Sequence, residues 1–223
     1  MYKGDFRMSN VLEERMIKIR TMGCPVPLKV VPGHFATNHS HINYYIDMTT
    51  LKTRQNEAKA IAQNFATKYS TVDVVDTIVC MDSCEVIGAY LAEALADRGV
   101  SSMNLHQTIY VVSPEYNGAG QMIFRDNIQP MIHGKNVLLV LASAATGKTV
   151  NQCVECLDYY GGKLVGISAI FSAVDKIGNY EVDSIFKKSD LPEYHTYRYT
   201  ECPFCKNGHR IEALVNSFGY SVL

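Results

Sequence analysis

Helical periodicity marks three segments of this chain. From Arg54 to Tyr69 the apolar side chains recur at the spacing that places them on one face of a helix. The same spacing recurs in "SCEVIGAYLAEALADRG", residues 83–99, where Gly99 is a typical helix stop. A third helical pattern follows Thr149 and ends at Gly161-Gly162. The first face comprises Ala58, Ile61, Ala62 and Phe65, and the second comprises Ile87, Tyr90, Leu91, Ala94 and Leu95.

Continuous apolar runs between these helices predict buried strands. They are "DVVDTIVCM" at 73–81, "NVLLVLA" at 136–142 and "KLVGISAIFSAV" at 163–174. Such strands, alternating with helices, indicate a parallel sheet that is covered on both faces, so the expected fold class is α/β. "TIYVVSP" and "QMIFRD" flank Asn117-Gly118, which predicts two strands joined by a loop. Residues 20–42 are rich in Pro and Gly and are expected to form a loop.

Composition and charge narrow the class of protein. The 223 residues suffice for one full core, and the net charge of −1 gives no bulk attraction to nucleic acid or membrane. We therefore expect the protein to bind neither nucleic acid nor a membrane. The seven cysteines, an odd number, and a start without the apolar stretch of a signal peptide indicate a cytoplasmic protein.

The stretch "VLLVLASAATGKTV", residues 137–150, carries candidate chemistry. It predicts a strand, a small-residue loop and then a helix, an order that places free backbone N–H groups where a phosphate can bind. The candidate phosphate-binding residues are Ala145, Thr146, Gly147, Lys148 and Thr149. A tight turn capped by Thr is the simpler alternative. A nucleoside-triphosphate P-loop is another, with Ala142 at its first glycine and Asp175 as its magnesium ligand.

Several motifs, in order, resemble those of type I phosphoribosyltransferases, and of orotate phosphoribosyltransferase in particular. "VLLVLASAATGKTV" resembles the family's phosphoribosyl-pyrophosphate loop, and "GHFATNHSHINYYIDMTTLK", residues 33–52, resembles its N-terminal motif. "VVSPEYNGAGQMIF", residues 111–124, stands where the family has a mobile catalytic loop. "CPFCKNGHRI" is similar to a tail found in some orotate enzymes. The matching positions of the N-terminal motif are Gly33, Phe35, Tyr44, Tyr45 and Asp47.

The resemblance implies an architecture and a set of site residues. It implies a parallel-sheet type I phosphoribosyltransferase fold with an N-terminal helix and hood segment at 1–52, a core at 53–200 and a C-terminal CxxC tail at 201–223. It also implies a homodimer. Tyr44 and Tyr45 become candidates for stacking on a base, although strand alternation equally allows one to pack in the core and one to face solvent. The expected pyrophosphate turn is Asp82, Ser83, Cys84 and Glu85.

The departures from the family bear on activity. Leu141 and Ala142 replace the family's acidic pair, and apolar side chains cannot offset the positive charge of a ribosyl transition state. The 111–124 segment also lacks the family's Lys and His. We therefore expect a protein that binds phosphoribosyl pyrophosphate or orotate monophosphate without the usual transfer. An active phosphoribosyltransferase and a P-loop phosphotransferase remain alternatives.

Catalytic residues and metal ions are less well specified by the sequence. No catalytic residue or metal ligand is assigned in the nucleotide site. Asp82 and Glu85 could hold Mg²⁺ there, or could cap the start of a helix. Cys202 and Cys205 have the spacing of a Zn²⁺ knuckle. His209 is expected as a third ligand, and either Cys24 or His195 could complete the site.

Overall fold

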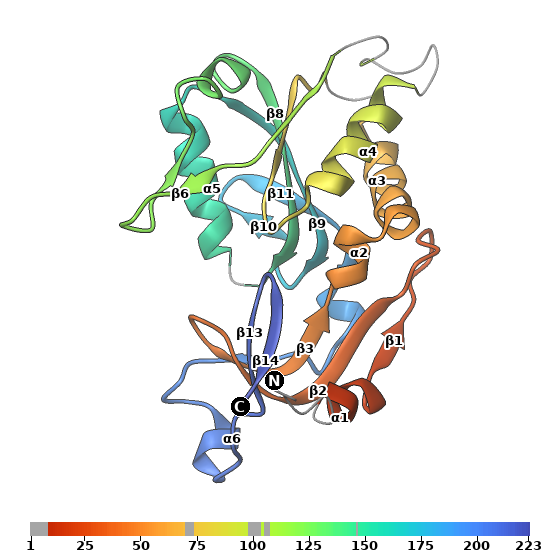
Figure 1. Cartoon of the computed structure of the whole chain (residues 1–223), viewed down its shortest axis with the longest axis vertical. Coiled ribbons are helices and arrows are strands. Elements are labelled where there is room, and N and C mark those ends of the chain that lie inside the picture. Colours follow the sequence, from red (N-terminus) through yellow and green to blue (C-terminus); the bar gives the residue numbers. More distant parts are fainter. Residues whose placement is uncertain (1–8, 70–73, 98–103, 105–107, 146) are drawn as a thin grey trace, which may run out of the picture.

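The chain forms two main sheets, one above the other in Figure 1. The computed structural model describes residues 9–69, 74–97, 104, 108–145 and 147–223, without the side chains of 9–11 and 148. The core sheet has the strand order β10-β11-β9-β8-β4-β5. Its strands are β4 (Thr77–Cys80), β5 (Tyr110–Val112), β8 (Asn136–Ala144), β9 (Lys163–Ser172), β10 (Lys176–Ile177) and β11 (Tyr180–Lys187).

The core sheet confirms the expected α/β class. All neighbouring pairs are parallel except β10 with β11. Helices α3 (Gln55–Tyr69) and α4 (Glu85–Ala96) lie on one side of it and α5 (Lys148–Tyr159) on the other (Figure 1). Because both faces are covered, β4 and most of β8 are fully buried, which explains their continuous apolar sequence.

A second sheet forms a hood below the core. Its order is β12-β3-β2-β13-β14, and β1 also pairs with β2. The strands come from both ends of the described chain: β1 (Ile17–Ile19), β2 (Leu28–Ala36), β3 (His41–Asp47), β12 (Thr196–Tyr197), β13 (Ala213–Asn216) and β14 (Gly219–Val222). The short helices α1 (Ser9–Glu14), α2 (Thr49–Thr53) and α6 (Pro203–Lys206) accompany this sheet in sequence. The domain boundaries at 52 and 200 stay predictions. The hood sheet takes strands from both sides of the predicted core in the sequence, and its strand β12 lies within residues 53–200.

Two local expectations were wrong. Residues 28–36 form β2 rather than part of a loop, and the strand accommodates Pro32 beside a register shift between Pro32 and Phe35. The strands around Asn117-Gly118 also differ from the prediction. β5 joins the core sheet, and the hairpin is a separate pair, β6 (Glu115–Tyr116) with β7 (Met122–Ile123).

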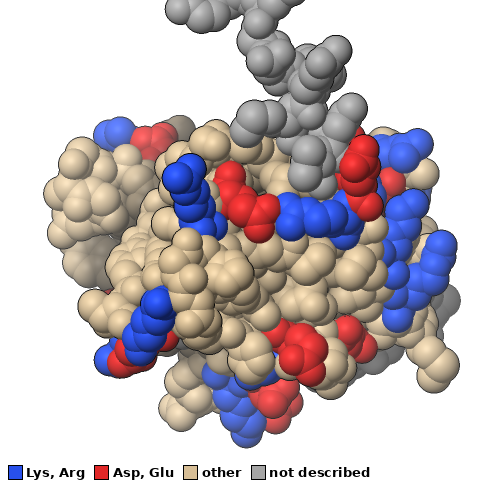
Figure 2. Space-filling view, turned by 90° about the horizontal axis from the view of Figure 1, so that it is seen from below, with Lys and Arg blue, Asp and Glu red and all other residues tan. Residues whose placement is uncertain are grey.

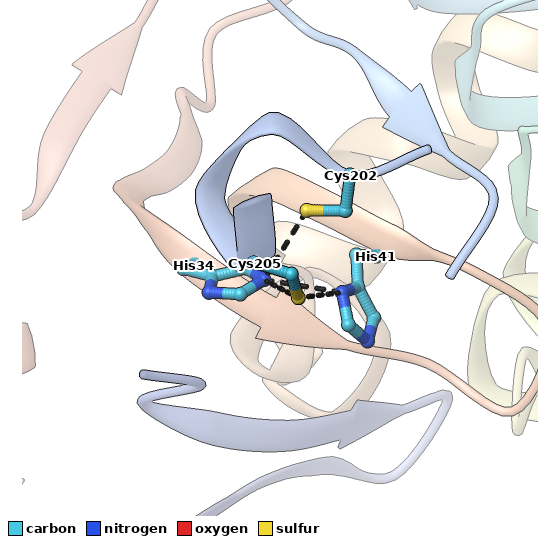
Figure 3. A group of neighbouring side chains, drawn as sticks. All are labelled: His34, His41, Cys202 and Cys205. Atoms are coloured by element: carbon cyan, nitrogen blue, oxygen red, sulfur yellow. Dashed lines mark hydrogen bonds between the residues drawn. The ribbon is translucent and has the colours of Figure 1, made fainter. Parts of the chain in front are cut away.

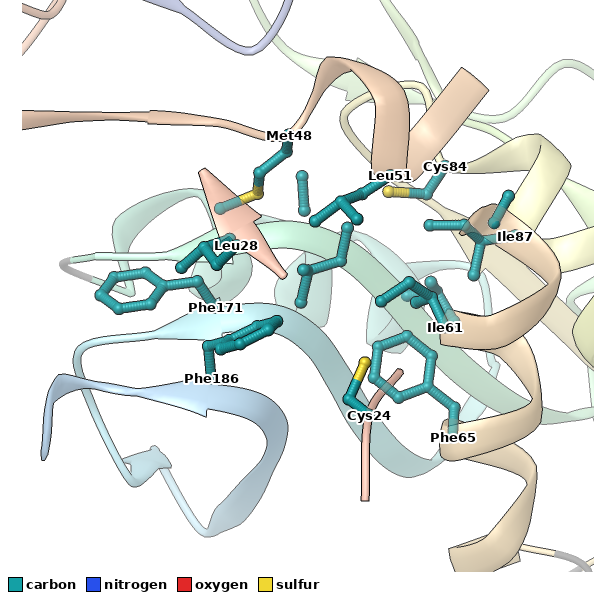
Figure 4. Close-up of a cluster of buried hydrophobic side chains, with 14 of the residues drawn as sticks. Cys24, Leu28, Met48, Leu51, Ile61, Phe65, Cys84, Ile87, Phe171 and Phe186 are labelled. Atoms are coloured by element: carbon teal, nitrogen blue, oxygen red, sulfur yellow. The ribbon is translucent and has the colours of Figure 1, made fainter. Parts of the chain in front are cut away.

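Two apolar clusters hold the layers together. The larger packs α3 and α4 against the core sheet and continues down to the hood, and Figure 4 shows Phe65, Ile61 and Ile87 on the helical side with Phe171 and Leu28 facing them. The smaller lies between the other face of the sheet and α5, and includes Leu139, Leu141 and Cys153. Consecutive β8 residues alternate between the two clusters, as the pleat of a strand requires.

The surface and helix lengths bear on possible partners. Figure 2 shows acidic and basic side chains interspersed on one face. Among the described residues, no helix is both long and apolar enough to cross a membrane.

Candidate functional site

A cleft of about 330 Å³ lies where the hood meets the carboxyl ends of the core strands. Ligands of open α/β sheets bind at this edge. Four loops line the cleft, together with residues of β3 and α2: the β2–β3 loop, the turn after β4, the loop between β8 and α5, and the β13–β14 turn. The first three belong to the segments in which the sequence motifs predicted the N-terminal motif, the pyrophosphate turn and the phosphate loop. The fourth, which includes Ser217, was not anticipated.

The phosphate loop enters the cleft at the start of α5. Ala145, Gly147 and Thr149 line the cleft, and Gly147 caps the helix with a φ of +74°. Only glycine adopts this left-handed conformation readily, so the residue fixes the direction in which the helix begins. Thr149 is exposed, so its hydroxyl is accessible to a ligand. Thr146 and the side chain of Lys148 lie outside the described residues.

The turn after β4 has an unusual backbone. Asp82 and Ser83 both have positive φ, at 56° and 62°. Consecutive non-glycine residues in this region are strained, and such strain is concentrated at functional sites. Asp82 lines the cleft, whereas Ser83, Cys84 and Glu85 do not. Cys84 is fully buried as the cap residue of α4, and exposed Glu85 accepts a hydrogen bond from the Ser113 hydroxyl at 2.7 Å.

The Asp82 carboxylate points across to the end of β8. The backbone N–H groups of Ala142 and Ser143 lie close enough to this carboxylate to favour its ionised form. Burial raises its pKa, and Lys52 and these two N–H groups partly oppose that rise. Asp82 is half-buried, and the cap residue of α4 is Cys84, so the alternative in which Asp82 is an exposed helix cap is wrong. Among the described residues that line the cleft, Asp82 is the only carboxylate.

Lys52 is the one lysine or arginine among the described residues that line the cleft. It is only 5% exposed, and its ammonium group donates to the carbonyls of Asp82 at 2.7 Å and Ser217 at 2.6 Å. These two bonds tie the core turn to the β13–β14 turn, so Lys52 connects opposite walls of the cleft. Sequence reasoning missed it, although it ends the matched 33–52 segment.

The two candidate base-binding tyrosines have different environments. Tyr45 is 5% exposed, lines the cleft and makes an edge contact with Tyr220 at 5.3 Å between ring centroids. Its pKa is raised, chiefly by burial, so its hydroxyl stays protonated at neutral pH. Tyr44 is half-buried and is not among the cleft-lining residues. Of the two, only Tyr45 is placed to meet a ligand in this cleft.

Apolar side chains form the wall where the resembled family has carboxylates. Leu141 is 2% exposed and Ala142 is 5% exposed, and both line the cleft together with Phe171. Asp175, which the P-loop interpretation requires as a magnesium ligand, is exposed and does not line the cleft. The geometry therefore favours the phosphoribosyl interpretation of the loop over the P-loop.

The hairpin β6–β7 projects from the body of the molecule (Figure 1). Asn117 organises its turn, since its side-chain oxygen accepts the N–H groups of Ala119 at 3.0 Å and Gln121 at 2.9 Å. Arg125 pairs with Glu115 at 2.9 Å across the hairpin. No described residue from 115 to 125 lines the cleft of its own chain.

A group of four side chains brings the C-terminal cysteine pair to the hood. Cys202 and Cys205 lie beside His34 and His41, and the ligand atoms of all four are within 4.8 Å of one another (Figure 3). Cys24, His195 and His209, expected beside the cysteines, lie outside this group. Both histidines were visible in "GHFATNHSH". Because β2 was expected to be a loop, nothing indicated that they face each other across a hairpin.

Comparisons with known proteins bear on part of the sequence and on the fold. No family model matches the chain. Two curated orotate phosphoribosyltransferases align with it over 75 residues, at 33% identity for Thermoanaerobacter sp. (strain X514) and 31% for Caldanaerobacter subterraneus subsp. tengcongensis. Each alignment spans 34% of this chain and 38% of the relative.

Solved structures resemble the fold over most of the chain. Leishmania donovani UMP synthase has a TM-score of 0.53 at 16% identity, over 81% of this chain and 36% of that one. Orotate phosphoribosyltransferase from Aeropyrum pernix has a TM-score of 0.51 at 17% identity, over 83% of this chain and 97% of the other. Orotate phosphoribosyltransferase from Mycobacterium tuberculosis has a TM-score of 0.51 at 14% identity, over 82% of this chain and 96% of the other. The chain therefore has the type I phosphoribosyltransferase fold, and about one third of it is similar in sequence to orotate phosphoribosyltransferases.

Proposed function

We propose that the cleft binds a 5′-phosphorylated ribose or nucleotide, such as phosphoribosyl pyrophosphate or orotate monophosphate. One observation carries this proposal: the matched phosphate loop, the strained Asp82 turn and the hood loop all line one cleft. The phosphate would sit against the backbone of Ala145 and Gly147 at the start of α5, where the helix dipole favours an anion. The ribose and base would extend toward Lys52 and Tyr45.

We further propose that ribosyl transfer is slow. Transfer builds positive charge on the ribose as pyrophosphate leaves, and an enzyme must stabilise that charge. Leu141 and Ala142 give the corresponding wall no carboxylate. In this proposal the protein is a homodimer, acts in the cytoplasm and takes part in pyrimidine metabolism as a ligand-binding protein rather than as a fast enzyme.

An active phosphoribosyltransferase is the second candidate, and Asp82 is the observation that favours it. Its carboxylate lines the cleft near the end of β8, where the backbone N–H groups of Ala142 and Ser143 favour its ionised form. It could therefore substitute for one member of the missing acidic pair, and could contribute to a Mg²⁺ site with the substrate's pyrophosphate. Glu85, the other carboxylate considered, does not line the cleft.

Calorimetric titration with orotate monophosphate tests binding. We expect saturable binding by the natural chain and roughly tenfold weaker binding by Thr149→Val, which keeps the side-chain shape but removes a hydroxyl donor to a charged phosphate. Thr67→Val is the matched control, because Thr67 is exposed on α3 and does not line the cleft. Absence of binding, or equal weakening by both substitutions, would contradict the proposed site.

Isotope exchange between labelled pyrophosphate and phosphoribosyl pyrophosphate, in the presence of orotate, separates the two candidates. Slow exchange alongside clear binding supports the binding protein. Fast exchange that Asp82→Asn abolishes supports the active enzyme instead.

A further inference from the structure

The four side chains His34, His41, Cys202 and Cys205, here called the His₂Cys₂ group, come from two distant parts of the chain. His34 lies on β2 and His41 on β3, on either side of the loop that lines the cleft. Cys202 immediately precedes α6, and Cys205 lies within it. His34 and Cys202 are separated by 168 positions in the sequence. Three of the four residues are buried and Cys205 is exposed.

Four separations among the ligand atoms are close to those of a tetrahedral metal site. Zinc bound to two imidazole nitrogens and two thiolates, with ordinary bond lengths, separates N from N by about 3.3 Å and N from S by about 3.6 Å. Here His34 Nε2 lies 3.1 Å from His41 Nδ1 and 3.4 Å from the Cys202 sulfur. The Cys205 sulfur lies 3.3 Å from His41 Nδ1 and 3.7 Å from His34 Nε2.

The surroundings of His34 determine which of its nitrogens faces the group. Its Nδ1 is 3.1 Å from the carbonyl oxygens of both His209 and Arg210. Carbonyl oxygens only accept, so Nδ1 carries the proton and Nε2 presents its lone pair to the other three side chains. Metal-ligating histidines are oriented in this way, with the second ring nitrogen donating to a carbonyl or carboxylate.

The cysteine segment has the form of a metal-binding knuckle. α6 is a single turn in which the N–H of Lys206 bonds the Cys202 carbonyl and the N–H of Gly208 bonds that of Cys205. Gly208 has a φ of +74°, which turns the chain away after the second cysteine. Phe204 stacks on the His34 ring at 5.1 Å between centroids. Both thiols are free rather than joined in a disulfide.

We propose that the His₂Cys₂ group binds one structural Zn²⁺ ion that fastens the C-terminal segment to the β2–β3 hairpin. Two thiolates and two imidazoles are the ligand set that Zn²⁺ prefers, and four protein ligands leave no open position for substrate or water. The ion would close a long loop of chain, which is where a cross-link restricts the unfolded state most. It would also fix the Thr37–Ser40 loop on the wall of the cleft.

Metal analysis of the purified full-length protein tests this proposal. We expect about one Zn²⁺ per chain by elemental analysis, retained on dialysis and released when a mercurial reagent blocks the thiols. Replacement by Co²⁺ should give the visible absorption of tetrahedral cobalt with thiolate ligands. Zinc removal should lower the melting temperature, and re-addition should restore it. None of these measurements depends on nucleotide binding.

Substitutions assign the ion to these residues. Cys205→Ser and His41→Gln should each reduce the zinc content at least several-fold, whereas His209→Gln and His195→Gln should retain it as matched controls. Cys205→Ser changes an exposed residue, so it is the variant best suited to remain folded. Metal-free natural protein, a Cys202–Cys205 disulfide, a bound metal other than zinc, or zinc lost equally from the controls would overturn the proposal.

Discussion

At the scale of single residues, Leu141 and Ala142 determine what the cleft can do. Both side chains sit in apolar clusters on opposite faces of β8 as well as lining the cleft. Their apolar side chains therefore contribute to packing, and burying a carboxylate at either position would lower the stability of the fold. The Asp82 carboxylate already lies near the backbone N–H groups at this strand end, so added carboxylates would also repel it.

Restoring the acidic pair tests this interpretation. Leu141→Asp with Ala142→Asp should raise the rate of pyrophosphate exchange, though modestly, because cooperating groups are not additive and the hairpin still lacks its cations. The same change should lower the free energy of unfolding by about 2–5 kcal/mol, the usual cost of burying polar groups. Leu141→Asn with Ala142→Asn is the matched control, with similar shape and no charge. Equal rates in the two double variants would show that charge at this wall is not what limits transfer.

The sequence predicted some site residues and missed others for a physical reason. Gly147 and Asp82 could be found because a loop between a strand and a helix has a local signature. Lys52 and His34 could not, since their importance depends on partners far away in the chain. Lys52 bonds the carbonyl of Ser217, and His34 meets Cys202. Tertiary partners of this kind leave no periodicity in the sequence.

At the scale of elements, long regular sequence patterns predicted the core helices and strands correctly, whereas the strands of the hood were predicted poorly. The helices α3, α4 and α5 occur where their periodicity predicted them, and the core strands β8 and β9 occur where continuous apolar runs predicted them. In contrast, β2 contains Pro32 and Gly33, which are strong loop signals. Its pairing with β3 and β13 outweighs this local preference. Strands held by non-local pairing are those that single-sequence reasoning identifies least well.

Glu212 joins β2 to the C-terminal segment, and this connection should be pH-dependent. Its carboxylate accepts the His34 N–H at 3.0 Å and pairs with Arg15. Burial alone would raise its pKa, but hydrogen bonds from Arg15 and the His34 amide outweigh this and lower it. Because the pKa is lower in the folded state, the stabilisation is present above the unfolded value of about 4.3 and is lost as the pH falls through the folded value.

Glu212→Gln should therefore melt at a lower temperature than the natural protein at neutral pH. The difference should shrink as the pH falls below about 4. Thermal unfolding followed by circular dichroism across this range measures it. Glu181→Gln is the control, because Glu181 forms only an exposed pair with Lys176 at 3.7 Å and should show little change. A pH-independent difference for Glu212→Gln would mean that its charge does not contribute.

At the scale of the whole molecule, the cleft exists because the two ends of the chain share one sheet. β13 lies beside β2 in that sheet, and the β13–β14 turn reaches the cleft wall where Lys52 bonds Ser217. The hood is consequently built only after most of the chain is available. The His₂Cys₂ group and Glu212 both hold these ends together, which gives the C-terminal segment a direct part in shaping the site.

The final prediction concerns association. The family resemblance implies a homodimer, and the β6–β7 hairpin, which stands where the family has its mobile loop, lines no part of its own cleft within the described residues. We expect light scattering at micromolar concentration to give about twice the 24.9 kDa chain mass.

A cation added to the hairpin tests whether the hairpin serves a neighbouring site. Exposed Ala119 is the position at which to add it, because Asn117 holds the turn. In a dimer, Ala119→Lys should raise exchange by the acid-restored protein, and Ala119→Gln should not. A monomer, or equal effects of Lys and Gln, would exclude a shared site of this kind.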